Sequence, residues 1–289
     1  MRVAQRSLLT IVLLLGATAA SVLLLVLALA PILLWSAQAP ETMMPEQSAA
    51  KAKALLQQAI TALGGQTYLR VRDAECTGRF ALFGHSGDLT GYTPFHDFSK
   101  LPDKDRTEYA KKGNIIDVYN GNQGWSMDRG GVQEASASAI EDYQAGLKKD
   151  VDQLLRFRLN EEGMNFRYGG SDIVDLKQVE WVEVVDRDRR TFRIALDSST
   201  HLPIRVVVTT RNATTRERDE EITYFSNYHS EQGVQTPFQV TRERNGFKVY
   251  QVFLTGCQYN TGLSDELFTR ASLEKRFSET KGSALSAAA

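Results

Sequence analysis

Hydrophobic residues recur at two different spacings along the chain, and each spacing is typical of one kind of secondary structure. Between residues 48 and 65, "SAAKAKALLQQAITALGG", apolar positions repeat every three or four residues. This spacing predicts an amphipathic helix with Ser48 as its cap and Gly64-Gly65 as its end. From residue 71 to residue 83 apolar and polar positions alternate. The chain therefore passes from a helix into a strand with one buried face.

Strand-like and helical patterns continue through the first half of the chain. The segments "DRTEYA", "NIIDVYN" and "GWSMD", between residues 105 and 128, are separated by Gly and Asn and predict an antiparallel meander. The segment 136–159 returns to the helical spacing, with polar residues opposite one apolar stripe, and we expect this second helix to cover an apolar surface. The stripe consists of Ile140, Tyr143, Leu147, Val151, Leu154 and Leu155.

The region 166–259 carries the alternating pattern of seven to eight further strands. Within it, "ALDSSTHLPIRVVVTT" (195–210) places a polar tetrad at 197–200 between two apolar runs. Such residues bond their own backbone and favour turns, and Pro203 suits the start of the next strand, so the stretch predicts a hairpin. Asn245-Gly246 predicts another. The sequence therefore predicts an α+β fold built on a single, strongly curved antiparallel sheet.

The amino terminus predicts a membrane segment. The run from Ser7 to Trp35 has no charge and, at about 1.5 Å per residue, exceeds the roughly 30 Å hydrocarbon core of a bilayer. Cleaved signals have shorter apolar cores, and Pro40 follows the cleavage-like "AQA" at 37–39, so an uncleaved anchor is favoured over a long cleaved signal. Arg2 and Arg6 place the amino terminus in the cytoplasm.

Four parts of the chain follow from these patterns: residues 1–37 as a membrane anchor or long signal, 38–47 as a tether, 48–272 as the globular domain and 273–289 as a tail. The expected location is the inner membrane, with a single span and a periplasmic carboxyl-terminal domain. After signal cleavage, the alternative is a free periplasmic protein.

Composition narrows the function classes. The formal net charge is −1 and 24% of residues are charged, so nothing indicates nucleic acid as a partner. Candidate catalytic motifs are weak. The sequence "GHSGD" (84–88) lacks the second glycine of a nucleophile elbow, and we interpret it as a loop. The histidines have no metal-ligand spacing, so neither a metal nor a cofactor is predicted, and we expect no enzyme. These histidines are His85, His96, His201 and His229.

The two cysteines lie in the first and last predicted strands of the globular domain. Cys76 and Cys257 could form a disulfide in an oxidising compartment. The alternative is two buried thiols, and this state is slightly favoured because the two strands need not be neighbours. The sequence leaves both alternatives open.

Several segments, in their order, resemble the LolA/LolB-like family of periplasmic outer-membrane lipoprotein carriers. They include "ALGG", "CTGRF", "NGNQGW", "LDSSTHLPIRVVV", "FSNY" (225–228) and "NTGLSDELF" (260–268). The resemblance spans roughly residues 50–270 and includes no catalytic motif. It implies an incomplete β-barrel closed by helices over its open concave face, which holds acyl chains. The retained anchor departs from such carriers, because they are usually released into the periplasm.

Two hypotheses on function remain. In the first, a membrane-tethered periplasmic domain binds a lipid, an acyl chain or a lipoprotein in an apolar cavity, for transport or sensing. In the second, a dry scaffold or regulatory module binds a protein partner in the envelope. If the cavity exists, we expect it to be lined by Phe80, Leu82, Phe192, Ile194, Phe238, Val240 and Phe253, with Leu147, Leu154 and Leu155 of the second helix as a lid.

Overall fold

The computed structural model describes residues 43–84, 86–109, 114–211 and 216–286. Residues from Pro45 onward form one compact unit, which contains every core cluster discussed below, so we treat residues 45–289 as a part able to fold independently. The expected anchor, 1–37, and the first half of the expected tether, 38–42, lie outside the described residues. Within the described residues, no helix is long and apolar enough to cross a membrane.

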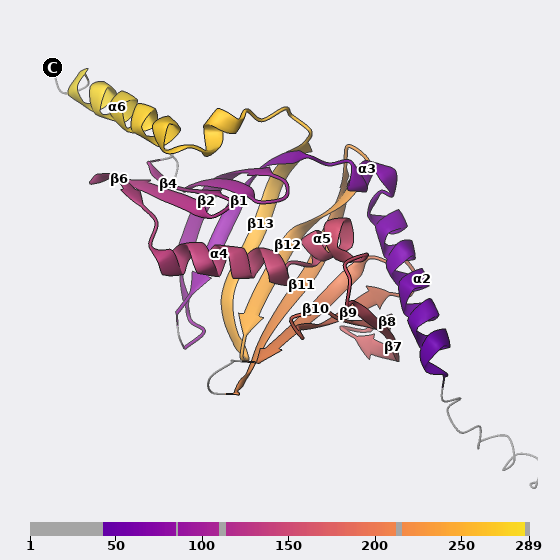
Figure 1. The fold of residues 1–289 in the computed structure, drawn as a ribbon. Coiled ribbons are helices and arrows are strands. Elements are labelled where there is room, and N and C mark those ends of the chain that lie inside the picture. Colours follow the sequence, from indigo (N-terminus) through magenta and orange to yellow (C-terminus); the bar gives the residue numbers. More distant parts are fainter. Residues whose placement is uncertain (1–42, 85, 110–113, 212–215, 287–289) are drawn as a thin grey trace, which may run out of the picture. The chain divides into compact units, whose positions relative to one another are not determined.

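One antiparallel sheet contains all 13 strands of the described residues. In chain order the strands are β1 (Asp73–Phe83), β2 (Leu89–Lys100), β3 (Lys104–Tyr109), β4 (Ile115–Asn120), β5 (Gln123–Asp128), β6 (Gly131–Glu134), β7 (Asn165–Val174), β8 (Lys177–Val185), β9 (Thr191–Asp197), β10 (Pro203–Arg211), β11 (Arg218–Glu231), β12 (Val234–Arg244) and β13 (Phe247–Tyr259). Their order in the sheet is β6-β5-β4-β3-β2-β1-β13-β12-β11-β10-β9-β8-β7, so β6 and β7 are free edges. The predicted single antiparallel sheet is confirmed, and it is open and curved (Figure 1).

The predicted meander and the strands of the second half of the chain are present, whereas β2 has no counterpart in the sequence prediction. This strand, "LTGYTPFHDFSK", contains Gly91 and Pro94, which are depleted from strands. It nevertheless pairs with β1 along almost its whole length. Turn-forming residues therefore concealed a twelve-residue strand.

The first described helix, α2 (Pro45–Leu63), begins three residues before the expected cap. Proline suits the first turn of a helix because its missing N–H would have no intrahelical partner there. Ser48 lies inside the helix, and its Oγ accepts a hydrogen bond from the Tyr168 backbone N–H at 2.9 Å. The helix ends at Leu63, directly before the expected stop at Gly64-Gly65. A Cβ atom at Gly64 would lie only 2.4 Å from the Gly233 carbonyl oxygen. Because glycine has no Cβ, the chain can pass close to the start of β12 before the next helix, α3 (Gln66–Leu69), begins.

The second predicted helix is broken in two. Helix α4 (Ala137–Lys149) stops at Asp150, whose backbone is extended. The Asp150 carboxylate accepts a hydrogen bond from the Asp152 N–H at 3.0 Å and so caps a new start. The short α5 (Val151–Gln153) and the π-helix η1 (Leu154–Arg158) follow. Because of this break, α5 and η1 reach the core while α4 has no buried residue.

The main core lies between α2 and one face of the sheet, which we call the inner face. Leu56 and Ile60 of α2 pack in one cluster with Val184, Phe192 and Val206 of β8–β10. Helix α4 lies on the same face over the other half of the sheet, where Tyr143 stacks on Tyr119 of β4 with ring centroids 4.4 Å apart. Figure 1 shows both helices on this side of the strands.

Two further clusters occupy the opposite, outer face. Trp181 and Val207 belong to one of them, on β7–β10. In the other, Ile116 and Val118 of β4 pack against Phe268 and Leu273 from the 3-10 helix η2 (Asp265–Phe268) and from α6 (Arg270–Ser286). Leu273 is fully buried, so the fold continues beyond residue 272, where the sequence predicted a tail.

Candidate ligand cavity

A cavity of about 450 Å³ lies between the inner face of the sheet and the elements α3, α5 and η1. Its walls come from β1–β3 and β11–β13, which lie far apart in the sequence but are neighbours in the sheet. Much of the wall is aromatic, and Phe80 stacks on Tyr250 at 5.1 Å between ring centroids. The aromatic lining includes Phe80, Phe95, Phe225, Tyr228, Tyr250 and Tyr259. The cavity volume falls in the range of about 300–1,000 Å³ that is usual for small-molecule sites.

Three of the ten expected cavity residues line this space: Phe80, Leu155 and Val240. Three others, Leu154, Phe192 and Ile194, have no exposed surface and lie in the core cluster with α2. The alternation in "TFRIALD" correctly placed Phe192 and Ile194 on the inner face. At that position, however, α2 fills the space above them, so they are closed core.

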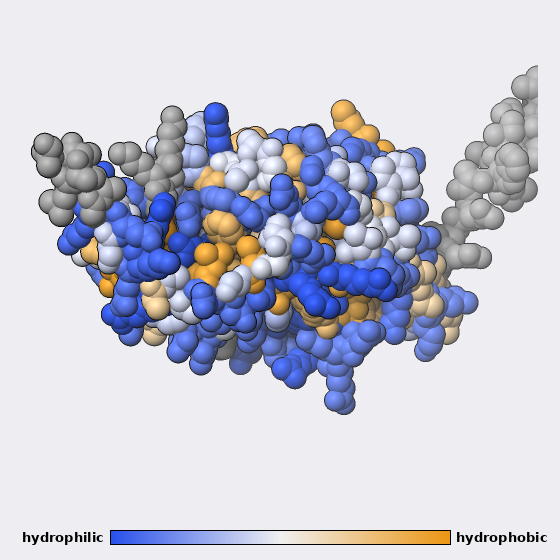
Figure 2. Space-filling view, turned by 90° about the horizontal axis from the view of Figure 1, so that it is seen from above, coloured by the Kyte–Doolittle hydropathy of each residue, from blue (hydrophilic) through white to orange (hydrophobic). Residues whose placement is uncertain are grey.

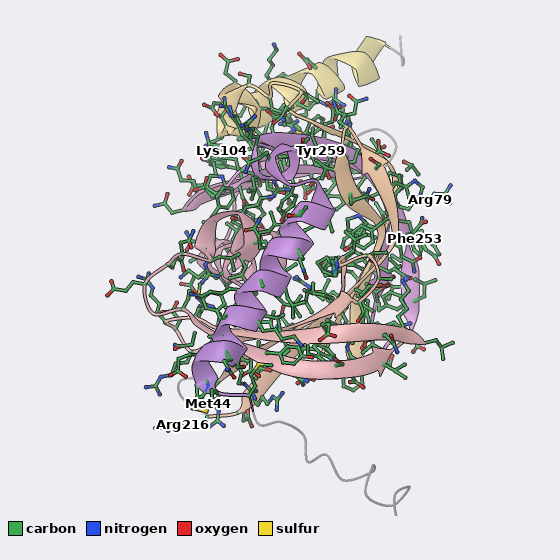
Figure 3. All side chains as sticks on the ribbon, turned by 90° about the vertical axis from the view of Figure 1, so that its right-hand side faces the viewer. Met44, Arg79, Lys104, Arg216, Phe253 and Tyr259 are labelled. Atoms are coloured by element: carbon green, nitrogen blue, oxygen red, sulfur yellow. A yellow bond between two sulfur atoms is a disulfide. The ribbon has the colours of Figure 1, made fainter. Side chains whose placement is uncertain are left out.

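The other four expected residues lie elsewhere. Phe253 groups with Arg79 and Tyr92 on the outer face, because Val252 and Leu254 take the inward positions of β13. Figure 3 shows Arg79 and Phe253 at the outer side of the sheet. Leu82 is 47% exposed at the hairpin end of β1.

Phe238 and Leu147 complete the set. The Phe238 ring stacks on His229 at 4.1 Å between ring centroids. Leu147 of α4 is half-buried beside Pro102 and Arg158, in a separate small pocket. Neither contributes to the wall of the large cavity.

A disulfide joins Cys76 and Cys257, and both residues belong to the cavity wall. Strands β1 and β13 are neighbours, and the two cysteines stand directly opposite each other in their register. Of the two alternatives left open by the sequence, the structure has the bridge. The bridge links β1 and β13, which are the first and last strands along the chain, and it thereby joins the two halves of the sheet.

One end of the cavity carries a closed set of polar contacts. The Tyr68 hydroxyl donates to Asp152 at 2.7 Å, and the Arg156 Nε donates to the other carboxylate oxygen at 2.5 Å. The Arg156 guanidinium also lies 3.7 Å from the centroid of the Tyr68 ring and donates to the Tyr68 carbonyl oxygen. Burial, with the Asp152 carboxylate nearby, raises the pKa of Tyr68 well above its ordinary value. These groups satisfy one another.

A second polar set, on β2 and β3, is acidic. Asp97 lines the cavity, and the Thr107 hydroxyl donates to it at 2.9 Å. Burial raises the pKa of Asp97 to about 6, although the Thr107 hydrogen bond opposes that shift. Burial and the Asp97 charge also raise the pKa of Asp105. Across the cavity, burial raises the pKa of Asp150 to about 6, and the Asp152 charge adds to the effect.

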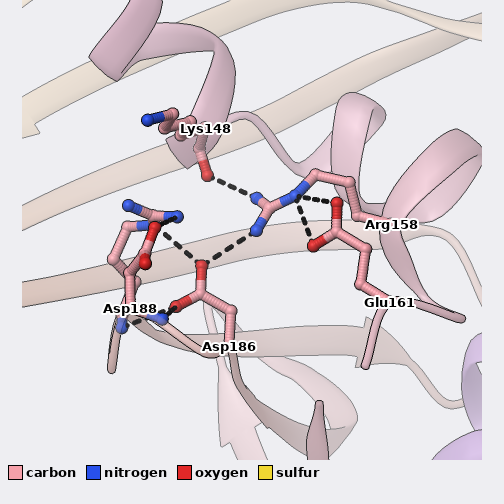
Figure 4. Close-up of polar contacts among 6 residues, drawn as sticks. Lys148, Arg158, Glu161, Asp186 and Asp188 are labelled. Carbon is pink, nitrogen blue, oxygen red and sulfur yellow. Dashed lines mark hydrogen bonds and ion pairs between the residues drawn. The ribbon is translucent and has the colours of Figure 1, made fainter. Parts of the chain in front are cut away.

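An ion-pair network around Asp186 holds η1, which borders the cavity, and the neighbouring helix α4 in place (Figure 4). Arg158, at the end of η1, donates to Asp186 at 2.9 Å and to the Lys148 carbonyl oxygen of α4 at 2.7 Å. Arg190 donates to the same Asp186 oxygen at 2.8 Å. This network fixes the carboxyl-terminal ends of α4 and η1 to the turn between β8 and β9.

The segments that carried the family resemblance have structural roles around the cavity. Asp197 accepts hydrogen bonds from the Ser199 and Thr200 backbone N–H groups at 2.9 and 3.1 Å, which forms the predicted turn. The Tyr228 hydroxyl, from "FSNY", donates to the Pro203 carbonyl oxygen at 2.6 Å. These contacts hold β10 and β11 in place. Burial raises the pKa of Asp197 but the donors outweigh it, so the pKa is lowered to about 2.

The "GHSGD" stretch and the histidines were the groups considered for catalysis or metal binding. Ser86 of the "GHSGD" stretch donates to Asp88 at 2.7 Å in an exposed turn between β1 and β2. Among the described residues, no three His, Cys, Asp or Glu side chains are grouped to hold a metal ion.

The fold is shared with solved bacterial structures of low sequence identity. A DUF1329 family protein from Desulfovibrio piger superposes with a TM-score of 0.54 at 16% identity, covering 77% of this chain and 98% of that one. A domain described as an outer membrane lipoprotein-sorting protein, from Vibrio parahaemolyticus, gives 0.52 at 13% identity, with 77% and 99% covered. A LolA superfamily protein from Nitrosomonas europaea gives 0.49 at 14% identity, with 77% and 99% covered.

No protein-family model and no curated protein sequence matches the chain. At these identities the likeness concerns the fold alone. The resemblance expected from the sequence is thus confirmed at the level of the fold, which this chain shares with the lipoprotein-sorting protein domain.

Proposed function

We propose that the unit 45–289 binds an acyl chain of a lipid or lipoprotein in the large cavity, and that it acts as a carrier or sensor without catalysing a reaction. The observation that supports this most is the cavity itself. Its aromatic and aliphatic walls suit an apolar chain, which gains roughly 25 cal/mol for each Å² of apolar surface removed from water. The lipoprotein-sorting domain of the same fold agrees with this proposal.

The location of the protein belongs to the proposal as well. The charge-free run from Ser7 to Trp35 would tether the unit to the inner membrane, with the unit on the periplasmic side. The disulfide agrees with an oxidising compartment. On the face seen in Figure 2, hydrophobic residues form small patches among hydrophilic ones, so the face does not offer one broad apolar surface.

Two adjacent residues of β13 provide a sharp test. Val252 lines the cavity, while Phe253 faces outward beside Arg79. A fluorescent acyl probe should bind the unit 45–289, and Val252→Asp should abolish that binding because a charge would be placed among apolar walls. The matched control, Phe253→Asp, should bind the probe as wild type does.

Native mass spectrometry of the unit, purified from bacterial envelopes, should also show added mass of lipid. A folded wild-type unit without probe binding and without lipid would refute the carrier proposal. In that case the scaffold that binds a protein partner would become the better explanation.

A further inference from the structure

The wall of the large cavity combines apolar surface with more carboxylates than cationic side chains. Three carboxylates line it: Asp97, Asp150 and Asp152. Of these, Asp152 forms an ion pair with Arg156, which is the only Lys or Arg among the lining residues. Asp150 is used as a helix cap. Asp97 has one hydrogen bond in the described residues, from the Thr107 hydroxyl, and no ion pair there.

The surroundings of Asp97 add negative charge rather than compensating for it. On the neighbouring strands, Asp105 and Asp117 share its face, and Tyr109 and Tyr143 lie near enough for its charge to raise their pKa values. Facing Asp97 on β1 is Cys76, which is in the disulfide and does not titrate. The imidazole near Asp97 is that of His96, and its Nε2 lies at hydrogen-bonding distance, 2.8 Å, from the Glu75 carboxylate oxygen Oε1.

On the helical side of the cavity, the charged lining residues are Asp150, Asp152 and Arg156. Arg242 lies behind this lining, where its charge acts on Asp150 and its guanidinium is 3.9 Å from the Glu221 carboxylate. With Arg156 neutralised by Asp152, the space as a whole favours positive charge. An anionic group placed there would be repelled, and in a partly dehydrated cavity this repulsion is stronger than in water.

We propose that the cavity selects amphiphiles whose polar end is a protonated amine, with Asp97 as the residue that pairs with it. This inference rests on the proposed function, because the apolar walls must first hold the chain. It adds the sign of the charge that the polar end carries. Asp97 is then a specificity-determining residue, and carboxylate-ended chains such as free fatty acids are disfavoured ligands.

The test measures how well three competitors with the same chain length displace a neutral fluorescent reporter from the cavity. Bound 1-N-phenylnaphthylamine on the unit 45–289 is displaced at pH 7.5 by dodecylamine, dodecanol or laurate, each below its micellar concentration. We expect dodecylamine to compete about tenfold or more better than dodecanol, and laurate to compete worse than dodecanol. A tenfold preference corresponds to about 1.4 kcal/mol.

A substitution and a change of pH test whether Asp97 causes the preference for dodecylamine over dodecanol. Asp97→Asn should bring dodecylamine to within about twofold of dodecanol, with both competitors measured against the variant's own affinity for the reporter. The control Asp142→Asn, which removes the same charge from the exposed side of α4, should keep the preference. At pH 5, below the pKa of about 6 of Asp97, the wild-type preference should shrink as well.

The outcomes separate the two proposals. If neither the reporter nor dodecanol binds, the proposed function fails. If both bind but laurate competes as well as dodecylamine, or if Asp97→Asn keeps the full preference, only the charge selection is overturned. Where the preference for dodecylamine holds, lysophosphatidylethanolamine and an acylated lysine amide distinguish a phospholipid amine from a peptide amine, and competition by either one that exceeds that of dodecanol and is lost in Asp97→Asn supports the inference.

Discussion

The two halves of the sheet, on either side of the β1–β13 pair, differ in which faces carry buried clusters: the β7–β10 half has one on each face, whereas the described residues of the β3–β5 half have one on the outer face. In the β8–β10 half, Phe192 and Val184 are fully buried on the inner face beneath α2. In the β3–β5 half, Ile116 and Val118 are fully buried on the outer face, against η2 and α6. The inner face of this second half carries Asp117 and other polar residues, and α4 above it contains no buried residue.

This difference explains where the cavity lies. Helix α2 covers the inner face in one half of the sheet, and the inner face of the other half is polar, so between them lies a boundary where inward side chains are apolar but α2 does not cover them. Strands β12, β13 and β1 form that boundary, and Val240, Val252 and Phe80 line the space above it. The neighbouring acidic strands β2 and β3 then give one wall its charge.

The largest expected effect compares one aromatic residue from each half. Phe192→Ala removes a fully buried ring beneath α2 and should lower the free energy of unfolding by about 3–5 kcal/mol. Tyr143→Ala removes a half-buried ring of α4 that stacks on Tyr119, and it should cost about 1 kcal/mol. Urea unfolding of the unit 45–289 measures both values. Equal losses would show that the α4 half is as tightly packed as the α2 half.

The second effect concerns the bridge at the boundary. Replacing Cys76 and Cys257 together by serine releases a loop with a sequence separation of 181 residues, and it should lower the free energy of unfolding by about 2–5 kcal/mol. Thermal unfolding with and without dithiothreitol provides the measurement. The reductant should lower the melting temperature of wild type and leave that of the double variant unchanged. Two titratable thiols in denatured, unreduced wild type would contradict the bridge.

The third effect belongs to the hairpin of the α2 half. Asp197→Ala removes the acceptor of the turn and should cost about 1–3 kcal/mol at pH 7. The pKa of Asp197 is lowered to about 2 from 3.8, so its stabilisation is present above the higher value and disappears as pH falls through the lower one. Wild type and variant should therefore converge in stability near pH 2. The control, Asp188→Ala, changes an exposed turn carboxylate and should cost less. A gap between wild type and variant that did not depend on pH would contradict the role of the ionised carboxylate.

The smallest effect has the opposite sign and belongs to the acidic half. The pKa of Asp97 is raised from 3.8 to about 6, so the folded state binds a proton more tightly, and stability falls as pH rises between these values. Asp97→Asn should therefore stabilise the unit by about 1 kcal/mol at pH 7.5 and change little at pH 4. Melting curves at the two pH values give the comparison. A variant less stable than wild type at pH 7.5 would show that the carboxylate contributes a favourable contact.

Local patterns predicted most of the strands and the turns between them. The polar tetrad at 197–200 forms its turn, and the alternation of "TFRIALD" put Phe192 and Ile194 on the correct face. Strand β2 was hidden by Gly91 and Pro94. The break at Asp150 was hidden by an apolar stripe that continues through it.

The cavity residues were predicted less well, and for a definite reason. Phe253 was expected to face inward, yet in the register of β1 and β13 the residue opposite Phe80 is Val252. A bulge between Thr77 and Gly78 also shifts that register, so counting from the cysteines would have given the wrong face. Tyr228, Tyr250 and Asp97 carry no local signal that separates a cavity wall from a core or a surface.

The sequence by itself determined the single antiparallel sheet, the start and end of most strands and the turns, because these depend on side-chain periodicity and on backbone preferences within a few residues. The tertiary structure alone decided which strands are neighbours, that Cys76 meets Cys257, and which inward-facing residues are covered. Phe192 belongs to the closed core and Phe80 to the cavity wall, although both face inward from strands in which apolar and polar residues alternate. The difference is the presence of α2 above one and its absence above the other, and such long-range packing leaves no trace in local periodicity.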